Sequence, residues 1–148
     1  MKKIVAIIAL ASAVVFGLGV TLSAEDKPVD YKKLPAPAKE FIKKYFPGDK
    51  VVNATKDDDL VRPEYEVYLS SGAKIDFEHS GALEKVKTVG APVPEALIPV
   101  KIKSYVDSHY AGVTVQEYEV GKADYEVKLS NGLELKFNAA FKLIDIDD

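Results

Sequence analysis

Hydrophobic residues recur along this chain with two different periods. Apolar side chains appear every three or four positions in residues 34–45 and 98–109, which is the period of an amphipathic helix. Each segment has a proline near its start and is followed by a glycine, and both features are typical of helix boundaries. Apolar and polar side chains instead alternate, as in strands with one buried face, in four further segments: 65–69, 75–77, 125–129 and 133–137.

The second half of the chain matches the first half in sequence. Residues 34–48 align with residues 98–112 at an offset of 64, and residues 65–72 align with residues 125–132 at an offset of 60. The first half therefore carries four extra residues, most simply within 57–63. Two blocks that match at consistent offsets indicate an internal repeat.

The repeat and the two periods together predict the fold class. We expect an α+β protein made of two tandem copies of a helix followed by about four antiparallel strands, with the helices packed on one face of the sheet. The first copy is predicted to span residues 25–90 and the second residues 91–148.

The alternation also predicts how the hairpins are closed. A two-residue turn would set buried Leu69 opposite polar Lys74, which the pattern does not allow. A three-residue turn instead pairs Val67 with Ile75 and places Gly72 in the left-handed conformation that closes such hairpins. The same reasoning applies to the second hairpin.

The first 24 residues have the pattern of an export signal. Two lysines precede an apolar run from Ile4 to Val20, and the small residues Ser23 and Ala24 precede a switch to charge. We predict a cleaved signal peptide over residues 1–24, and therefore a periplasmic protein with no membrane contact after cleavage. The apolar run is also close to transmembrane length, so an uncleaved anchor is the alternative.

Composition excludes several classes of function. Lys and Arg number 20 against 23 Asp and Glu, with no basic run, so nucleic-acid binding is not expected. The absence of cysteine excludes disulfides, thiolate nucleophiles and Cys-ligated metals. The two histidines lack zinc-ligand spacing; we expect His79 to be exposed and His109, which matches Tyr45, to pack on its helix. With no nucleophile motif or phosphate-binding loop, we predict no enzymatic activity and no cofactor, with calcium as the one alternative.

The outward side of the second hairpin carries complementary charges. The predicted register sets Lys128 opposite Glu134 and Glu126 opposite Lys136, which stabilises the ladder. Tyr118 is expected to project from the polar side of its strand, where an exposed tyrosine is a good contact residue.

The first hairpin carries like charges at the same positions. Its register sets Tyr68 opposite Lys74 and Glu66 opposite Asp76. Four carboxylates are therefore expected to share one patch: Glu64, Glu66, Asp76 and Glu78. Such a patch suits calcium or a basic partner surface. The alternative is that the patch is neutralised by lysines of neighbouring strands, namely Lys50, Lys56, Lys85 or Lys87.

Specific segments resemble a known family. They are Leu34-Pro35, Phe41-Ile42, Tyr45-Phe46-Pro47-Gly48 and the Tyr-Glu-Val-x-Leu-Ser-x-Gly blocks, with their second copies. In these segments the chain resembles the PepSY-like periplasmic proteins of bacteria, which are related in architecture to the β-lactamase-inhibitor protein. The resemblance implies a non-enzymatic module whose sheet presents a surface to another protein, and some members carry a calcium-regulated label. The inhibitor's contact residues have no matching motif here.

We interpret the chain as a non-catalytic periplasmic binding module, inhibitor-like in character, that contacts an unidentified periplasmic protein through the polar face of its sheet. The predicted contact residues are Glu66, Tyr68, Lys74, Asp76, Tyr118, Glu126, Lys128, Glu134 and Lys136. The alternative is a calcium-binding or calcium-regulated protein whose ligands are Glu64, Glu66, Asp76 and Glu78.

Overall fold

The two segments with helical period form the two α-helices of the computed structural model, which describes residues 26–148. Helix α1 is Ala36–Tyr45 and helix α2 is Val100–His109. Two short 3-10 helices are Tyr31–Lys33 and Glu95–Leu97. The predicted signal peptide lies outside the described residues. None of the helices in the described part of the chain is long and apolar enough to cross a membrane.

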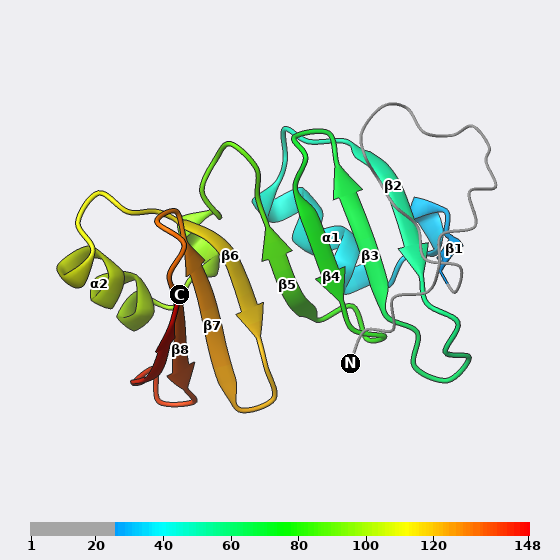
Figure 1. Ribbon diagram of the computed structural model, residues 1–148. Helices are drawn as coiled ribbons and strands as arrows, with labels where there is room; N and C mark the ends of the chain where they lie inside the picture. The colour runs from blue at the N-terminus through cyan, green and yellow to red at the C-terminus, as the bar shows by residue number, and fades with distance from the viewer. Residues whose placement is uncertain (1–25) are drawn as a thin grey trace.

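The remaining elements among residues 26–148 are nine strands. They are β1 (Lys27–Pro28), β2 (Val51–Lys56), β3 (Tyr65–Leu69), β4 (Lys74–Phe77), β5 (Leu83–Lys87), β6 (Val115–Val120), β7 (Asp124–Leu129), β8 (Glu134–Asn138) and β9 (Leu143–Asp147). All nine join one antiparallel sheet in sequence order (Figure 1).

The predicted fold of two tandem copies, each a helix with about four strands, is wrong. The sheet is continuous, because β5 pairs with β6 where the predicted copies would meet, with Val86 opposite Tyr118. It also begins with a strand, β1, that precedes α1. The physical reason is that two separate sheets would each expose a row of unpaired backbone N–H and C=O groups at this position. Pairing β5 with β6 satisfies both rows.

The predicted hairpin register is confirmed. Val67 pairs with Ile75, and the N–H of Leu69 donates to the carbonyl of Ala73 at 2.8 Å. Gly72 has φ = 91°, in the left-handed region, and so does Gly132 in the second hairpin, at 93°. The turn chemistry therefore sets which side chains face the core and which face solvent.

Both helices pack on the same face of the sheet, which is the buried one. The ring of Phe41 in α1 meets Phe77 of β4 edge-on, with centroids 5.5 Å apart. Tyr105 in α2 makes the same contact with Phe137 of β8, at 5.6 Å. The opposite face is left to polar side chains. We call it the polar face, and define it by the outward residues of β3 to β8: Glu66, Tyr68, Lys74, Asp76, Lys85, Lys87, Glu117, Glu119, Glu126, Lys128, Glu134 and Lys136.

Candidate functional site

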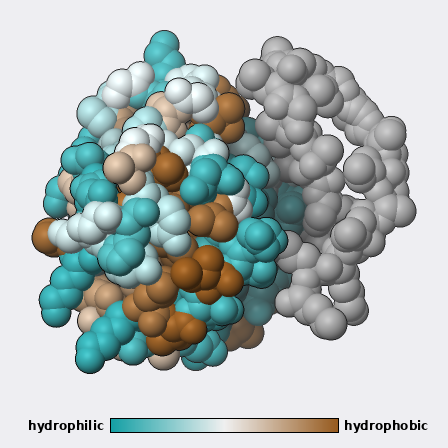
Figure 2. All heavy atoms as spheres, turned by 60° about the vertical axis from the view of Figure 1, so that its left-hand side comes forward, coloured by the Kyte–Doolittle hydropathy of each residue, from teal (hydrophilic) through white to brown (hydrophobic). Residues whose placement is uncertain are grey.

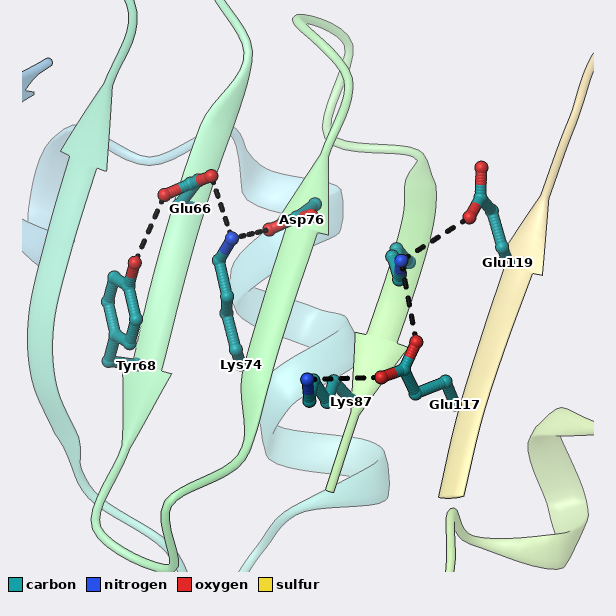
Figure 3. Close-up of polar contacts among 8 residues, drawn as sticks. Glu66, Tyr68, Lys74, Asp76, Lys87, Glu117 and Glu119 are labelled. Carbon is teal, nitrogen blue, oxygen red and sulfur yellow. Dashed lines mark hydrogen bonds and ion pairs between the residues drawn. The ribbon is translucent and has the colours of Figure 1, made fainter. Parts of the chain in front are cut away.

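Lys74 is the centre of the first group of polar-face contacts, on β3 and β4 (Figure 3). Its Nζ lies 2.8 Å from Oε1 of Glu66 and 3.4 Å from Oδ1 of Asp76. The hydroxyl of Tyr68 donates to the other oxygen of Glu66 at 3.1 Å. The two carboxylates that face each other across the ladder therefore share one ammonium group, and their predicted repulsion is offset.

The partial burial of this group changes its titration. Burial opposes the charge of Lys74, but the hydrogen bond that its ammonium donates to Glu66 and the attraction of Asp76 and Glu66 raise the pKa of the ammonium above its ordinary value. Burial first, and then the nearby charge of Glu66, raise the pKa of Tyr68 to about 12. At neutral pH the phenol is therefore a fixed donor and the ammonium a fixed cation.

The second group of contacts consists of ion pairs between β5 and β6, across the pairing that we call the seam. Lys85 lies 3.5 Å from both Glu117 and Glu119, and Lys87 lies 3.1 Å from Glu117 (Figure 3). Burial opposes the charge of Glu117, but the hydrogen bond from Lys87 and the charge of Lys85 lower the pKa of this carboxyl. Lys85 and Lys87 thus form ion pairs with the two glutamates of β6.

A shallow hollow of about 120 Å³ lies on the polar face beside this seam. It is lined by Lys85, Glu117, Glu119, Glu126, Val127, Lys128 and Glu134. The sequence did not indicate Lys85, Lys87, Glu117 and Glu119 as site residues, because their contacts depend on the pairing of β5 with β6. The signal that points to this pairing is that lysines occupy alternate positions of β5 and glutamates occupy alternate positions of β6.

The third group is on β7 and β8, where the predicted pairs of complementary charge are present. Lys128 faces Glu134 with 3.5 Å between the charged atoms, and Lys136 lies 3.5 Å from Glu126. Lys136 also lies 3.3 Å from Asp124. These side chains are more exposed than the group around Lys74, so their charges are more available to a partner and more screened by water.

Tyr118 does not belong to the polar face. It is 4% exposed and lies between Val86 and Val127 on the face that carries the helices. The expectation of an exposed contact residue is wrong because the register shifts between Val115 and Glu117, and the extra residue inverts the alternation along β6. Tyr118 is therefore a core residue.

The predicted metal ligands do not form a coordinating group. Among residues 26–148, no three His, Asp or Glu side chains are arranged to hold a metal ion. Glu66 and Asp76 contact Lys74 instead, while Glu64 and Glu78 are exposed.

Some negative charge nevertheless accumulates at this end of β3 to β5. Partial desolvation of the carboxyl, followed by the charges of Asp57 and Asp76, raises the pKa of Glu64 although the residue as a whole is exposed. Burial, followed by Glu64 and Asp76, raises the pKa of Glu84. Glu84 did not stand out in the sequence because it is the extra residue of the bulge between β4 and β5.

The two histidines lie in different parts of the fold: His79 follows β4, and His109 ends α2. His79 is exposed, as predicted. His109 is also exposed, but its ring stacks on Tyr105 at 4.0 Å and its Nδ1 lies 2.9 Å from the Tyr105 carbonyl oxygen. It therefore packs on its own helix, as predicted, without being buried.

Known proteins are similar to this chain over most of its length. A family model described as "Putative beta-lactamase-inhibitor-like, PepSY-like" matches residues 63–145. A crystal structure from Bacteroides vulgatus, a "putative periplasmic protein" of the DUF2874 family, is 40% identical, with 84% of this chain and 98% of that chain covered and a TM-score of 0.79. A "putative calcium-regulated periplasmic protein" from Bacteroides thetaiotaomicron is 42% identical, with 83% and 97% covered and a TM-score of 0.79. No curated protein matches the chain significantly.

Proposed function

The chain belongs to the PepSY-like family, and we propose that it is a non-catalytic periplasmic protein that binds a protein partner through its polar face. The periplasmic location is supported by the predicted signal peptide and by the periplasmic descriptions of its structural relatives. Binding rather than catalysis is supported by the candidate residues themselves, which form ion pairs and lack a nucleophile–base pair or a metal group in residues 26–148.

One observation carries the proposal: the charges of the polar face are fixed in place by one another. Lys74, Lys85 and Lys87 each contact carboxylates of the same face at 2.8–3.5 Å. A partner that meets side chains already held in position loses less conformational entropy on binding. Alternating charges also favour one partner and one register over others.

Two residues are the proposed anchors. Tyr68 is half-buried and presents an aromatic ring beside a charged pair, which suits the centre of an interface. Lys128 lines the hollow beside the β5–β6 pairing, and its side chain is 44% exposed. Around them, Glu66, Asp76, Glu126, Glu134 and Lys136 supply complementary charge.

A crosslinking comparison tests this proposal. A photo-reactive amino acid is placed at position 134, beside the anchor Lys128 on the polar face, or at position 101 on the exposed side of α2. We expect a defined periplasmic adduct from position 134 and none from position 101. The adduct should be lost in Tyr68→Ala, and retained in Lys43→Ala, a change on the helix side. Equal adducts from both positions would contradict the face assignment.

The family description favours an inhibitor-like role for such binding. If the partner is an enzyme, its activity should fall in proportion to the fraction bound, and Tyr68→Ala should restore the activity. The direct assay measures the activity of the crosslinked partner with and without this protein.

Calcium regulation is the alternative, favoured by the description of the relative from Bacteroides thetaiotaomicron. Its ligands would come from the acidic end of β3 to β5, and Glu66 and Asp76 would have to leave Lys74 to take part. A thermal melt of residues 25–148 in EDTA and in millimolar calcium tests it. A site at about 100 times its dissociation constant adds about 2.7 kcal/mol, on the order of 8–16 °C in Tm. The shift should be absent with magnesium and in Glu64→Gln/Glu78→Gln.

A further inference from the structure

The outer edge of β9 is uncovered among residues 26–148. In the described part of the chain, β9 is the last strand of the sheet and pairs only with β8. Figure 1 shows it in dark red at the end of the sheet. Figure 2 brings this end of the molecule forward and shows hydrophobic side chains gathered between hydrophilic ones on its surface. Ile144 and Ile146 of β9 are among the exposed large hydrophobic residues.

β5 shows how an edge of this kind is covered within the same molecule. β5 and β9 are equivalent strands of the internal sequence repeat, because Leu83 of β5 aligns with Leu143 of β9 at an offset of 60. Each of these leucines pairs with a phenylalanine, Phe77 or Phe137, directly after a shift of register. The two strands therefore enter the sheet with the same geometry.

The difference between the strands lies on their outer side. Val86 of β5 is 0% exposed, because β6 sets Tyr118 beside it. Ile146 lies at the corresponding position of β9, is paired with Leu135, and is 48% exposed. On the buried face, the outer side of β9 thus has room for one more apolar side chain.

The charges on the polar face are reversed between the two strands. Lys85 and Lys87 of β5 form ion pairs with glutamates of β6, whereas β9 carries Asp145 and Asp147 at the corresponding positions. Asp145 Oδ1 accepts the N–H of Ile146, and Asp147 Oδ1 accepts the N–H of Asp148, both at 3.0 Å. The carboxylates therefore lie beside the backbone groups that an added strand would use.

We propose that the β9 edge binds an extended segment of a partner protein in which two basic residues flank an apolar one. The segment would add a tenth antiparallel strand, as β6 adds to β5, with its basic side chains beside Asp145 and Asp147 and its apolar side chain over Ile146. A second copy of this chain paired through the same strand would set aspartate against aspartate, which is unfavourable. The inference does not rest on the polar-face proposal, because the edge and the face bind by different groups.

Matched peptides test the inference on the mature protein. The first is Val-Gln-Lys-Tyr-Lys-Val, the sequence of β6 from Val115 to Val120 with its two glutamates replaced by lysine. The second is the β6 sequence itself, and the third has the composition of the first in the order Lys-Lys-Val-Gln-Tyr-Val. Backbone amide shifts are followed by NMR during titration, and sedimentation of the free protein reports self-association.

We expect the first peptide to shift the amides of residues 143–148 and to bind about tenfold more tightly than either control. In Asp145→Lys/Asp147→Lys the preference should reverse toward the β6 sequence. Tyr68→Ala should leave the titration unchanged, so failure here is distinguishable from failure of the polar-face proposal. Equal binding of the lysine peptides, shifts confined to the polar face, no binding at millimolar peptide, or a dimer formed through β9 would each overturn the inference.

Discussion

Lys74 Nζ lies 2.8 Å from Oε1 of Glu66, on the neighbouring strand, and also within 3.4 Å of Asp76. Lys74 is directly opposite Tyr68 in the register, so this contact runs diagonally across the ladder. One flexible side chain thereby converts a pair of facing carboxylates into a shared ion pair. The repulsion expected between Glu66 and Asp76, which are directly opposite each other, is therefore offset by their contacts with Lys74.

Glu66→Ala should destabilise the protein. The substitution removes the closest partner of Lys74 and the acceptor of the Tyr68 hydroxyl, and both groups are partly buried. We expect a loss of about 1 kcal/mol in the free energy of unfolding, measured by urea denaturation. Glu126→Ala is the matched control on the second hairpin. Its side chain is 44% exposed against 30% for Glu66, so its loss should be below about 0.5 kcal/mol. Equal losses would contradict a special role for the Lys74 contacts.

Glu84→Gln should stabilise the protein at neutral pH. Burial, and then the charges of Glu64 and Asp76, raise the pKa of Glu84 above its ordinary value of 4.5. The charged form therefore costs the folded state stability, a cost that is absent below pH 4.5 and complete above the raised folded-state pKa. We expect Tm to rise by about 1–3 °C at pH 7 and to be unchanged near pH 3.5. Glu40→Gln, on the exposed side of α1, should change neither value. A gain that persists at the lower pH would contradict the electrostatic cause.

Tyr118→Ala should cost far more stability than Tyr68→Ala. Tyr118 is 4% exposed and packs in the core, so its removal leaves a cavity and should cost about 3–5 kcal/mol in the free energy of unfolding. Tyr68 lies half-buried on the polar face, so Tyr68→Ala should lower the free energy of unfolding by about 1 kcal/mol. Denaturant unfolding of the two variants checks this. Similar losses of stability in the two variants would contradict the burial of Tyr118 in the core.

Local patterns in the sequence predicted the local structure well. The helical period located α1 and α2, and the turn glycines set the register that pairs Glu126 with Lys136. The failures have a different origin. The inverted direction of Tyr118 follows from a bulge, which leaves no mark in an alternating pattern. The continuous sheet follows from pairing between strands almost thirty residues apart, which periodicity within a segment does not report.

The candidate site divides in the same way. Facing charges within a hairpin could be assigned because the turn fixes them, as for Lys128 and Glu134. The ion pairs of Lys85 and Lys87 with Glu117 depend on which strand lies beside β5, so periodicity within each strand could not assign them to the site. Register alone also does not determine the contacts of a long side chain, because Lys74 reaches past its direct neighbour Tyr68 to Glu66.

Gly81→Ala should be strongly destabilising because two separate costs coincide. Gly81 has φ = 88°, and a Cβ there would lie 2.8 Å from Cβ of Pro35 and 3.1 Å from the backbone nitrogen of Ala38. Left-handed backbone and overpacking against the start of α1 together should cost about 2–4 kcal/mol in the free energy of unfolding. Gly132→Ala is the control, since its φ is 93° and nothing lies within 4 Å of the added Cβ. Its cost should be limited to about 1–2 kcal/mol. Equal costs would show that the turn is not held against the helix.

Asp145→Val/Asp147→Val should cause the protein to self-associate. The two carboxylates accept backbone N–H groups next to them and keep charge along the exposed edge of β9, which hinders edge-to-edge pairing of sheets. The valines would leave an apolar strand with high β-propensity and a free edge. We expect sedimentation velocity to detect larger assemblies of the variant at concentrations where the unmodified protein shows no change in its state of association.

Asp145→Asn/Asp147→Asn separates the two contributions of these residues. The amide oxygen still accepts the neighbouring N–H, while the charge is lost. If charge repulsion protects the edge, the asparagine variant should associate nearly as strongly as the valine variant. If the local hydrogen bonds protect it, the asparagine variant should behave like the unmodified protein. Absence of association in both variants would mean that β9 is protected by neither device, and that the exposed isoleucines are tolerated in water on their own.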